Sequence, residues 1–179
     1  RSFRLVTFDG RELPLEQITY AGSQPAGYVT SPVEVVNYFE NHDNQTVYDL
    51  NAFKLLLATP SAERARVQIL AAALNAFSQG IAYYHAGVEL LRSKSMDRNS
   101  FDSGDWFNRI DWTGTVNHFG TGLPPAPDNA TSWPLMGPRL ADARLRPSPA
   151  DIEWTRNAFE DLLRIRSSST LFRLRSATD

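Results

Sequence analysis

Short apolar runs and longer amphipathic stretches alternate along this chain. Residues 35–39 form a run rich in β-branched and aromatic side chains, which suits a buried strand. The charged and amide residues at 40–44 cannot continue such a strand into a core, because an unpaired buried charge is costly. We therefore expect a strand that ends near Glu40 and presents its last side chains at one end of a sheet.

Two helices and a second strand are expected next. Apolar residues recur with helical spacing from Val47 to Leu57. A second helix is expected to start at Ser61, a candidate N-cap, and to end before Gly80, a candidate left-handed residue. The apolar run 81–84 then predicts a short strand that ends at His85. This strand–helix–helix–strand order predicts parallel strands, with the residues that follow both strands at the same end of the sheet.

The remaining segments are less regular. Residues 1–30 predict little more than a short strand at 5–8, and residues 89–147 predict a long polar loop whose aromatic residues argue against disorder. Ser148 followed by Pro149 is typical of a helix start, and that helix is expected to end near Ser167. A further strand is expected from residue 170.

Composition restricts the class of protein. Of 179 residues, 42% are apolar and 21% are charged, as in an ordinary soluble domain. The net charge of -2 argues against a nucleic-acid surface, and the lack of cysteine excludes disulfides and thiolate metal sites. No apolar run approaches the roughly 20 residues that span a bilayer. We expect a soluble protein, cytoplasmic or secreted, with no membrane or nucleic-acid partner.

Several motifs carry a resemblance. Residues 36–46, VNYFENHDNQT, resemble the seventh-strand motif of the α-amylase superfamily, glycoside hydrolase family thirteen. Residues 78–95 and 97–108 resemble the pullulanase and limit dextrinase-type debranching enzymes within it, and the stretches 122–125 and 133–140 extend the match.

The resemblance implies an α/β fold, a partial (β/α)8 TIM barrel. It would contain strands seven and eight with their helices and the long loop after strand eight, since a whole barrel takes about 250 residues. Residues 1–168 would form the C-terminal part of the catalytic barrel, and residues 169–179 would begin the connection to a C-terminal β domain. The remainder of its own barrel would be a partner.

The resemblance also implies hydrolysis of α-1,6 branch links in pullulan, starch or glycogen limit dextrins. Such enzymes retain configuration by using two carboxylates about 5–5.5 Å apart. The family's nucleophile Asp and acid/base Glu have no matching motif here and are expected upstream of Arg1. The chain alone is therefore expected to be inactive. An isolated barrel fragment would leave strand edges unpaired and an apolar helix face uncovered, so the chain is also expected to self-associate or to be partly molten.

The resemblance assigns catalytic roles to Asp43 and His42. Asp43 would bind hydroxyls of the sugar at the cleavage site and favour its oxocarbenium-like form, and His42 would donate a hydrogen bond to the same sugar. From the residues alone, Asp43 as the cap of the next helix and His42 as a hydrogen-bonded strand-end histidine remain alternatives.

Arg98 and Asn99 are the implied substrate-binding residues, in contact with the neighbouring sugar on the non-reducing side. Relatives often have Asp where Asn99 stands, and Asn keeps the shape of that side chain but loses its charge. The alternative for Arg98 is an ion pair with Asp97 or Asp102 that braces the loop.

Other residues are given plainer roles. Trp106 and Phe107 suit either a sugar-stacking surface or, as we favour, the core beneath the loop. His85 is expected to be structural. A metal site formed by His42, Asp43 and His85 is conceivable but disfavoured, because the family places sugar there. No metal is predicted in this chain, and the only cofactor that the resemblance leaves room for is a structural calcium ion in the full-length protein.

Two alternatives to the main function stay open. One is an isoamylase or branching-type relative, against which the Arg92–Ser95 stretch weighs. The other is a non-catalytic glucan-binding remnant that keeps the aromatic loop but lacks the reaction.

Overall fold

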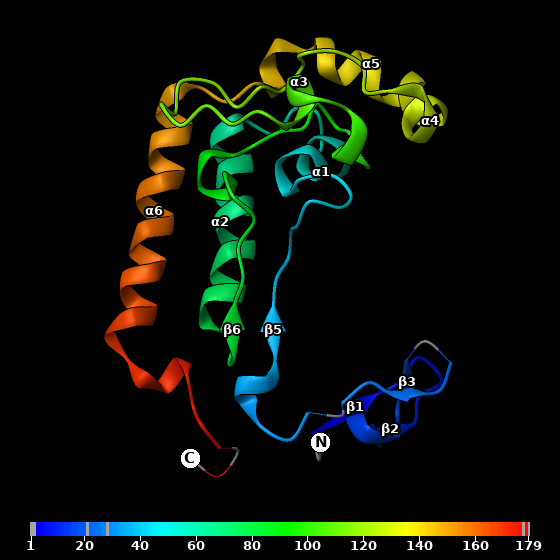
Figure 1. Ribbon diagram of the computed structural model, residues 1–179, viewed down its shortest axis with the longest axis vertical. Coiled ribbons are helices and arrows are strands. Elements are labelled where there is room, and N and C mark those ends of the chain that lie inside the picture. The colour runs from blue at the N-terminus through cyan, green and yellow to red at the C-terminus, as the bar shows by residue number, and fades with distance from the viewer. Residues whose placement is uncertain (1–2, 21, 28, 177, 179) are drawn as a thin grey trace. The chain divides into compact units, whose positions relative to one another are not determined.

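A computed structural model of the chain describes residues 3–20, 22–27, 29–176 and 178 (Figure 1). The chain divides into two compact units. Unit 1 comprises Arg1–Val36, Gln79–Ile81 and Thr170–Asp179, and unit 2 comprises Asn37–Ser78 and Ala82–Ser169. Each unit is described by itself.

Unit 1 contains two antiparallel hairpins in the segment expected to be irregular. β1 (Arg4–Val6) pairs with β2 (Glu12–Pro14), and β3 (Thr19–Tyr20) pairs with β4 (Gln24–Pro25). Gly10 lies in the turn of the first hairpin with φ +81°, a conformation that glycine adopts without steric cost. The expected strand at residue 170 is wrong, because Thr170–Phe172 forms a 3₁₀ turn.

The two strands that flank the helices are short and parallel. β5 (Val36–Asn37) and β6 (Ile81–Ala82) form a two-stranded sheet. The Ile81 N–H donates to the Val35 carbonyl at 2.8 Å and the Tyr83 N–H to the Asn37 carbonyl at 2.9 Å, so both strands advance in the same direction. The parallel pairing expected from the element order is confirmed.

The expected partial (β/α)8 barrel is wrong. Among the described residues the strands form three separate two-stranded sheets, and no barrel is closed. A barrel needs each strand to pair on both sides, whereas β5 and β6 pair only with each other and are two residues long. The expected division of the chain at residue 168 stays a prediction.

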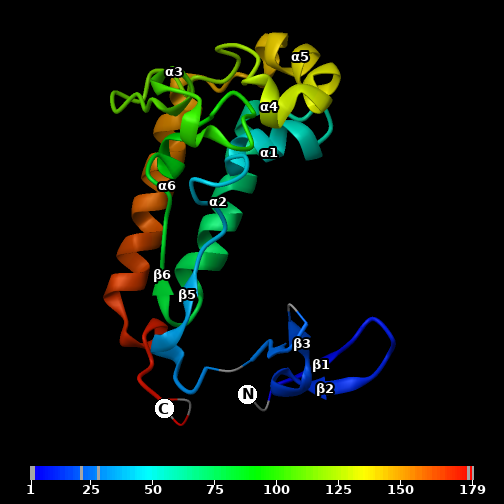
Figure 2. The ribbon, with the colours of Figure 1, turned by 45° about the vertical axis from the view of Figure 1, so that its right-hand side comes forward.

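Unit 2 is built on α1 (Val47–Lys54), α2 (Ser61–Phe77) and α6 (Pro149–Ser168), as the apolar spacing predicts. α2 and α6 lie side by side in both views (Figures 1 and 2). Ala72, Ala76, Val88, Phe159 and Leu162 are buried between them. The small alanines let the two helices approach closely.

Polar side chains fix the ends of these helices. Ser148 and Asp151 form a capping box at the start of α6, as the Ser148–Pro149 pair predicts. Ser61 is not the N-cap of α2, a position held by Pro60; its hydroxyl instead donates to Asp151 at 2.8 Å. Arg166 donates to the carbonyl of Ala76 at 2.6 Å, which satisfies the last turn of α2.

A buried arginine joins α1 to α2. Arg64 is 0% exposed and donates to the carbonyls of Asn51 at 2.6 Å and Leu56 at 2.7 Å. The carbonyls at the C-terminal end of α1 therefore have a cationic partner, which offsets the cost of burying the guanidinium.

The long segment 89–147 is more ordered than expected. It contains α3 (Asp105–Asn108), α4 (Ala126–Asn129) and α5 (Trp133–Ala141). Gly137 and Pro138 inside α5 conceal the helix in the sequence. Met136 and Leu140, one turn apart and both buried, hold α5 against a second core with Tyr48 and Leu145.

The 3₁₀ turns among the described residues are η1 (Leu15–Gln17), η2 (Pro32–Glu34), η3 (Val88–Leu90), η4 (Ser100–Asp102), η5 (Ala130–Ser132), η6 (Ala143–Leu145) and η7 (Thr170–Phe172).

No helix in the described part of the chain is long and apolar enough to cross a membrane. One face of α2 is nevertheless apolar and open: Leu70 is 61% exposed and Leu74, one turn later, is 69% exposed. Two adjacent exposed leucines on a helix favour association with another apolar surface.

The first prediction concerns this α2 stripe. Leu70→Gln/Leu74→Gln should reduce self-association of the 179-residue chain, because it removes the apolar area that association would bury. Sedimentation velocity over a range of concentrations measures the effect. Leu56→Gln is the matched control, since Leu56 is 80% exposed but lies outside the stripe. A chain that is monomeric with and without the double substitution would contradict the prediction.

Candidate functional site

The segment after β5 begins with two side chains that cap α1. Glu40 is 5% exposed, and its Oε2 accepts from the Val47 N–H at 2.6 Å. The Thr46 hydroxyl accepts from the Asp49 N–H at 3.2 Å and is the N-cap. A negative charge and a hydroxyl at a helix N-terminus are both stabilising. The caps of α1 are therefore Glu40 and Thr46, and the alternative of Asp43 as the cap is wrong.

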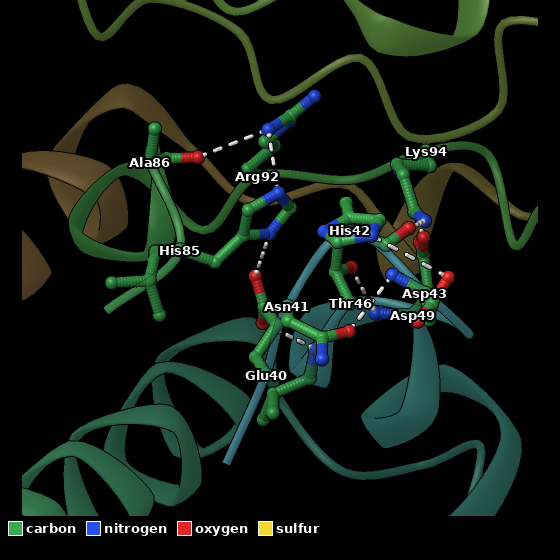
Figure 3. Close-up of polar contacts among 12 residues, drawn as sticks. Glu40, Asn41, His42, Asp43, Thr46, Asp49, His85, Ala86, Arg92 and Lys94 are labelled. Atoms are coloured by element: carbon green, nitrogen blue, oxygen red, sulfur yellow. Dashed lines mark hydrogen bonds and ion pairs between the residues drawn. The ribbon is translucent and has the colours of Figure 1, made fainter. Parts of the chain in front are cut away.

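His42 and Asp43 are neighbours on the same segment (Figure 3). Their side chains are 76% and 65% exposed, and Nε2 of His42 lies 3.7 Å from Oδ1 of Asp43. The Asp43 N–H donates to Asn41 Oδ1 at 2.8 Å, and Asn44 has a positive φ of 58°, so the chain turns sharply here. His42 is thus not a hydrogen-bonded strand-end histidine buried in the fold; its imidazole is available to a ligand.

The structure brings Arg98 and Asn99 to Asp43. An isolated antiparallel bridge pairs the backbone of Asp43 with that of Asn99. The Asn99 side-chain amide donates to Asp128 Oδ2 at 3.0 Å. Arg98 is exposed, and among the described residues its guanidinium has no recorded ion pair or hydrogen bond. The four residues assigned to sugar by resemblance therefore lie on two paired segments.

Asp97, rather than Arg98, braces this loop. Asp97 is 0% exposed, and its carboxylate accepts from the Asn99 N–H at 2.9 Å, the Ser103 hydroxyl at 2.6 Å and the Asn129 amide at 3.0 Å. A carboxylate with several donors can remain buried. The alternative in which Arg98 pairs with Asp97 or Asp102 is wrong, because Arg98 forms neither ion pair among the described residues.

A buried polar segment, Arg92–Ser95, supports the exposed residues. Its four members are between 1% and 9% exposed. Lys94 Nζ donates to the carbonyl of His42 at 2.7 Å, the Ser93 hydroxyl donates to Asp49 at 2.5 Å, and the Ser95 hydroxyl donates to the Gly122 carbonyl at 2.6 Å. The segment therefore ties the site to α1 and to the following loop.

His85 is held between two charged side chains. Arg92 Nη1 lies 3.1 Å from His85 Nε2, and Glu40 Oε1 lies 2.9 Å from Nδ1. Arginine has no acceptor, so Nε2 must accept and Nδ1 must carry the proton that Glu40 accepts. The imidazole is thereby fixed as one neutral tautomer, which agrees with the predicted structural role. The described residues contain no group of three or more His, Cys, Asp or Glu placed to hold a metal ion, so the conceivable His42–Asp43–His85 site is not formed.

Asp49 carries the most perturbed acidic group of the site. It is 0% exposed and accepts from Ser93 and, at 2.8 Å, from the Lys94 N–H. Burial raises the pKa of Asp49 from 3.8 to about 6, against the lowering effect of these hydrogen bonds. Burial likewise lowers the pKa of the Lys94 ammonium, while the nearby carboxylates of Asp49 and Asp97 act in the opposite direction.

Trp106 lies on the surface of the loop, whereas Phe107 is half-buried. Trp106 is 55% exposed, so its predicted place in the core is wrong. The Arg109 guanidinium stacks 4.0 Å from the Trp106 ring, and the indole N–H donates to the Thr121 carbonyl at 3.0 Å. Arg109 also lines a cavity of about 410 Å³ with His118 and Arg146, and neither His42 nor Asp43 contributes to that cavity.

The site offers a carboxylate, an imidazole, a guanidinium and an amide to a ligand. Buried, hydrogen-bonded side chains support these groups. This mixture of donors and acceptors suits a ligand with many hydroxyl groups. Sequence reasoning missed Glu40, Asp49, Lys94 and Asp97 as its supports. For Asp49 the available indication was its position within the helical stretch that begins at Val47, whereas Lys94 lies in the polar segment Arg92–Ser95 and carried no such indication.

Comparison with known proteins gives the following relatives. Residues 114–179 match the family described as alpha-1,6-glucosidases, pullulanase-type, C-terminal. The chain is 43% identical to "Pullulanase 1, chloroplastic" of Arabidopsis thaliana over 99% of its own length and 18% of that protein's. It is 38% identical to "Pullulanase" of Klebsiella aerogenes over 96% of its length and 16% of that protein's.

A solved structure agrees with these relatives. The Klebsiella pneumoniae pullulanase complexed with maltotriose matches with a TM-score of 0.84 and 37% identity over 96% of this chain and 16% of that one. The chain thus spans less than a fifth of the length of these relatives. The match of its second part to a C-terminal family is a further finding against the expected partial barrel.

The second prediction concerns the hydrogen bond between Asn99 and Asp128. Asn99→Asp should lower the free energy of unfolding by about 1 kcal/mol, because it replaces a hydrogen bond to Asp128 with two like charges. Asn99→Asp/Asp128→Asn should restore most of the loss, because it returns one donor and one acceptor. Urea unfolding of the three proteins measures this, and an unimproved double variant would contradict it.

The third prediction concerns pH. The folded-state pKa of Asp49 is about 6, above its ordinary value of 3.8, so the folded protein binds this proton more tightly than the unfolded chain. The contribution of Asp49 to the free energy of unfolding therefore falls as the pH rises from 4 to 6. Asp49→Asn removes this titration, so its stability relative to the wild type should improve over that interval. Urea unfolding of both proteins from pH 4 to pH 7 tests this, and a constant difference would exclude the raised pKa.

Proposed function

We propose that this chain is part of a pullulanase-type glycoside hydrolase that cleaves α-1,6 branch links in pullulan, starch or glycogen limit dextrins. One observation carries the proposal. The chain is 43% identical to a pullulanase over 99% of its length, and the residues that the resemblance assigns to sugar lie together where Asp43 pairs with Asn99, with His42, Asp43 and Arg98 exposed.

In this proposal Asp43 stabilises the transition state without forming a bond to the sugar. Its exposed carboxylate would accept hydrogen bonds from sugar hydroxyls, and these bonds strengthen as the ring becomes oxocarbenium-like. The turn at Asn44 and the hydrogen bond from Lys94 to the His42 carbonyl fix the direction of the Asp43 carboxylate before the sugar binds. Such preorganised interactions lower the barrier because they cost no rearrangement during the reaction.

His42, Arg98 and Asn99 would bind sugar around this carboxylate. The exposed His42 imidazole would donate to the same sugar as Asp43. Arg98, with its unpaired guanidinium, would contact the next sugar on the non-reducing side together with Asn99. Because one N–H of the Asn99 amide donates to Asp128, the second N–H and the carbonyl oxygen are left for sugar hydroxyls.

The bond-breaking carboxylates are expected outside this chain. A retaining mechanism needs a nucleophile and an acid/base about 5–5.5 Å apart, and neither family motif occurs in these 179 residues. The proposed partners are therefore an α-glucan substrate and the remainder of the parent protein. The isolated chain should be inactive.

The fourth prediction tests Asp43 in the parent protein. Asp43→Ala should lower kcat on pullulan by about a thousandfold or more, equivalent to about 4 kcal/mol of barrier, while the melting temperature stays the same. Asp161→Ala is the matched control, because the Asp161 side chain is 66% exposed, as Asp43 is 65%, but lies on α6.

The outcomes discriminate between the functions. Near-normal hydrolysis of pullulan by Asp43→Ala would reject the role of Asp43. A wild-type parent that binds maltotriose but releases no product from pullulan would instead support the glucan-binding remnant. Transfer of glucan chains in place of hydrolysis would identify a branching-type relative.

A further inference from the structure

Lys94 is a buried lysine directly beneath the exposed pair His42 and Asp43 (Figure 3). It is 1% exposed, and its Nζ donates to the carbonyl of His42 at 2.7 Å. That carbonyl belongs to the peptide group that links His42 to Asp43. A lysine is rarely buried to this extent, so the burial of Lys94 requires a specific explanation.

Two buried carboxylates accompany the ammonium. Asp49 and Asp97 are both 0% exposed, and both interact electrostatically with Lys94. Asp49 also accepts from the backbone N–H of Lys94, while Asp97 organises the loop that carries Arg98 and Asn99. The Lys94 ammonium therefore lies among the groups that fix the backbone of both segments of the site, the one with Asp43 and the one with Asn99.

The backbone around Lys94 is conformationally restricted. Ser95 and Met96 have positive φ values of 52° and 66°, a left-handed conformation that non-glycine residues rarely adopt. Both residues are buried, so surrounding contacts maintain this conformation. The side chain of Lys94 consequently starts from a fixed position and fixes the His42 carbonyl in turn.

We propose that Lys94 is a positioning residue: its ammonium holds the His42 carbonyl, and so orients the peptide from which the Asp43 carboxylate projects. The inference rests on the proposed function and adds a residue to it. Lys94 does not reach the substrate, because it lies below the segment and is almost inaccessible to solvent. Its effect on the reaction passes through Asp43.

Lys94→Met in the parent protein tests this, with pullulan as substrate. Loss of the hydrogen bond should lower kcat by about 10- to 100-fold, the effect usual for a residue that orients a catalytic group. KM should change by less than about threefold, because the sugar contacts remain. Lys54→Met is the matched control: Lys54 is the only other lysine and lies exposed on α1. Lys94→Arg, which keeps a cationic donor, should recover part of the loss.

A double-mutant cycle separates positioning from a general structural role. In single-turnover assays, Lys94→Met should cost no further activity once Asp43→Ala is present, because the group it orients is gone. The same fractional loss in both backgrounds, or wild-type kcat in Lys94→Met, would overturn the inference. Lys94→Gln, which leaves Asp49 and its hydrogen bonds in place, replaces Lys94→Met if that protein fails to fold. Failure of the proposed function is distinct, since the wild-type parent would then not hydrolyse pullulan.

Discussion

The buried carboxylate of Asp49 is the interaction on which the rest of unit 2 depends. It lies in the first turn of α1 and accepts from Ser93 and Lys94, residues that follow 44 and 45 positions later in the chain. One side chain thus connects the helix after β5 with the segment after β6. Without it, Lys94 would lose a fixed backbone position, and the His42 carbonyl would lose its donor. A buried acid is costly, and this one is tolerated because its oxygens are fully engaged.

The polar groups near Asp49 form two sets, one buried and one exposed. Glu40, Asp49, Lys94 and Asp97 are buried and use their hydrogen bonds within the protein. His42, Asp43 and Arg98 are exposed, and their polar atoms are open to solvent. The first set restricts the backbone so that the second set needs little rearrangement on binding, which is the physical basis of preorganisation.

The helices were predictable because their periodicity is local. The structure contains α1, α2 and α6, which the apolar spacing predicts, and α6 begins at the predicted Ser148–Pro149 pair. α5 was not predicted, because Gly137 and Pro138 disfavour helix and only burial of Met136 and Leu140 outweighs them. The predicted partial barrel was also wrong, because similarity between sequence motifs does not establish which strands pair through hydrogen bonds.

The sequence by itself determined α1, α2 and α6, the parallel direction of β5 and β6, and the neighbourhood of His42 and Asp43, since these depend on nearby residues and on chain connectivity. Only the tertiary structure decided which charges are buried. Glu40 and Asp43 are three positions apart and both acidic, yet one caps α1 and the other faces solvent. The difference arises because burial requires partners, and the partners of Glu40 and Lys94 come from segments distant in sequence.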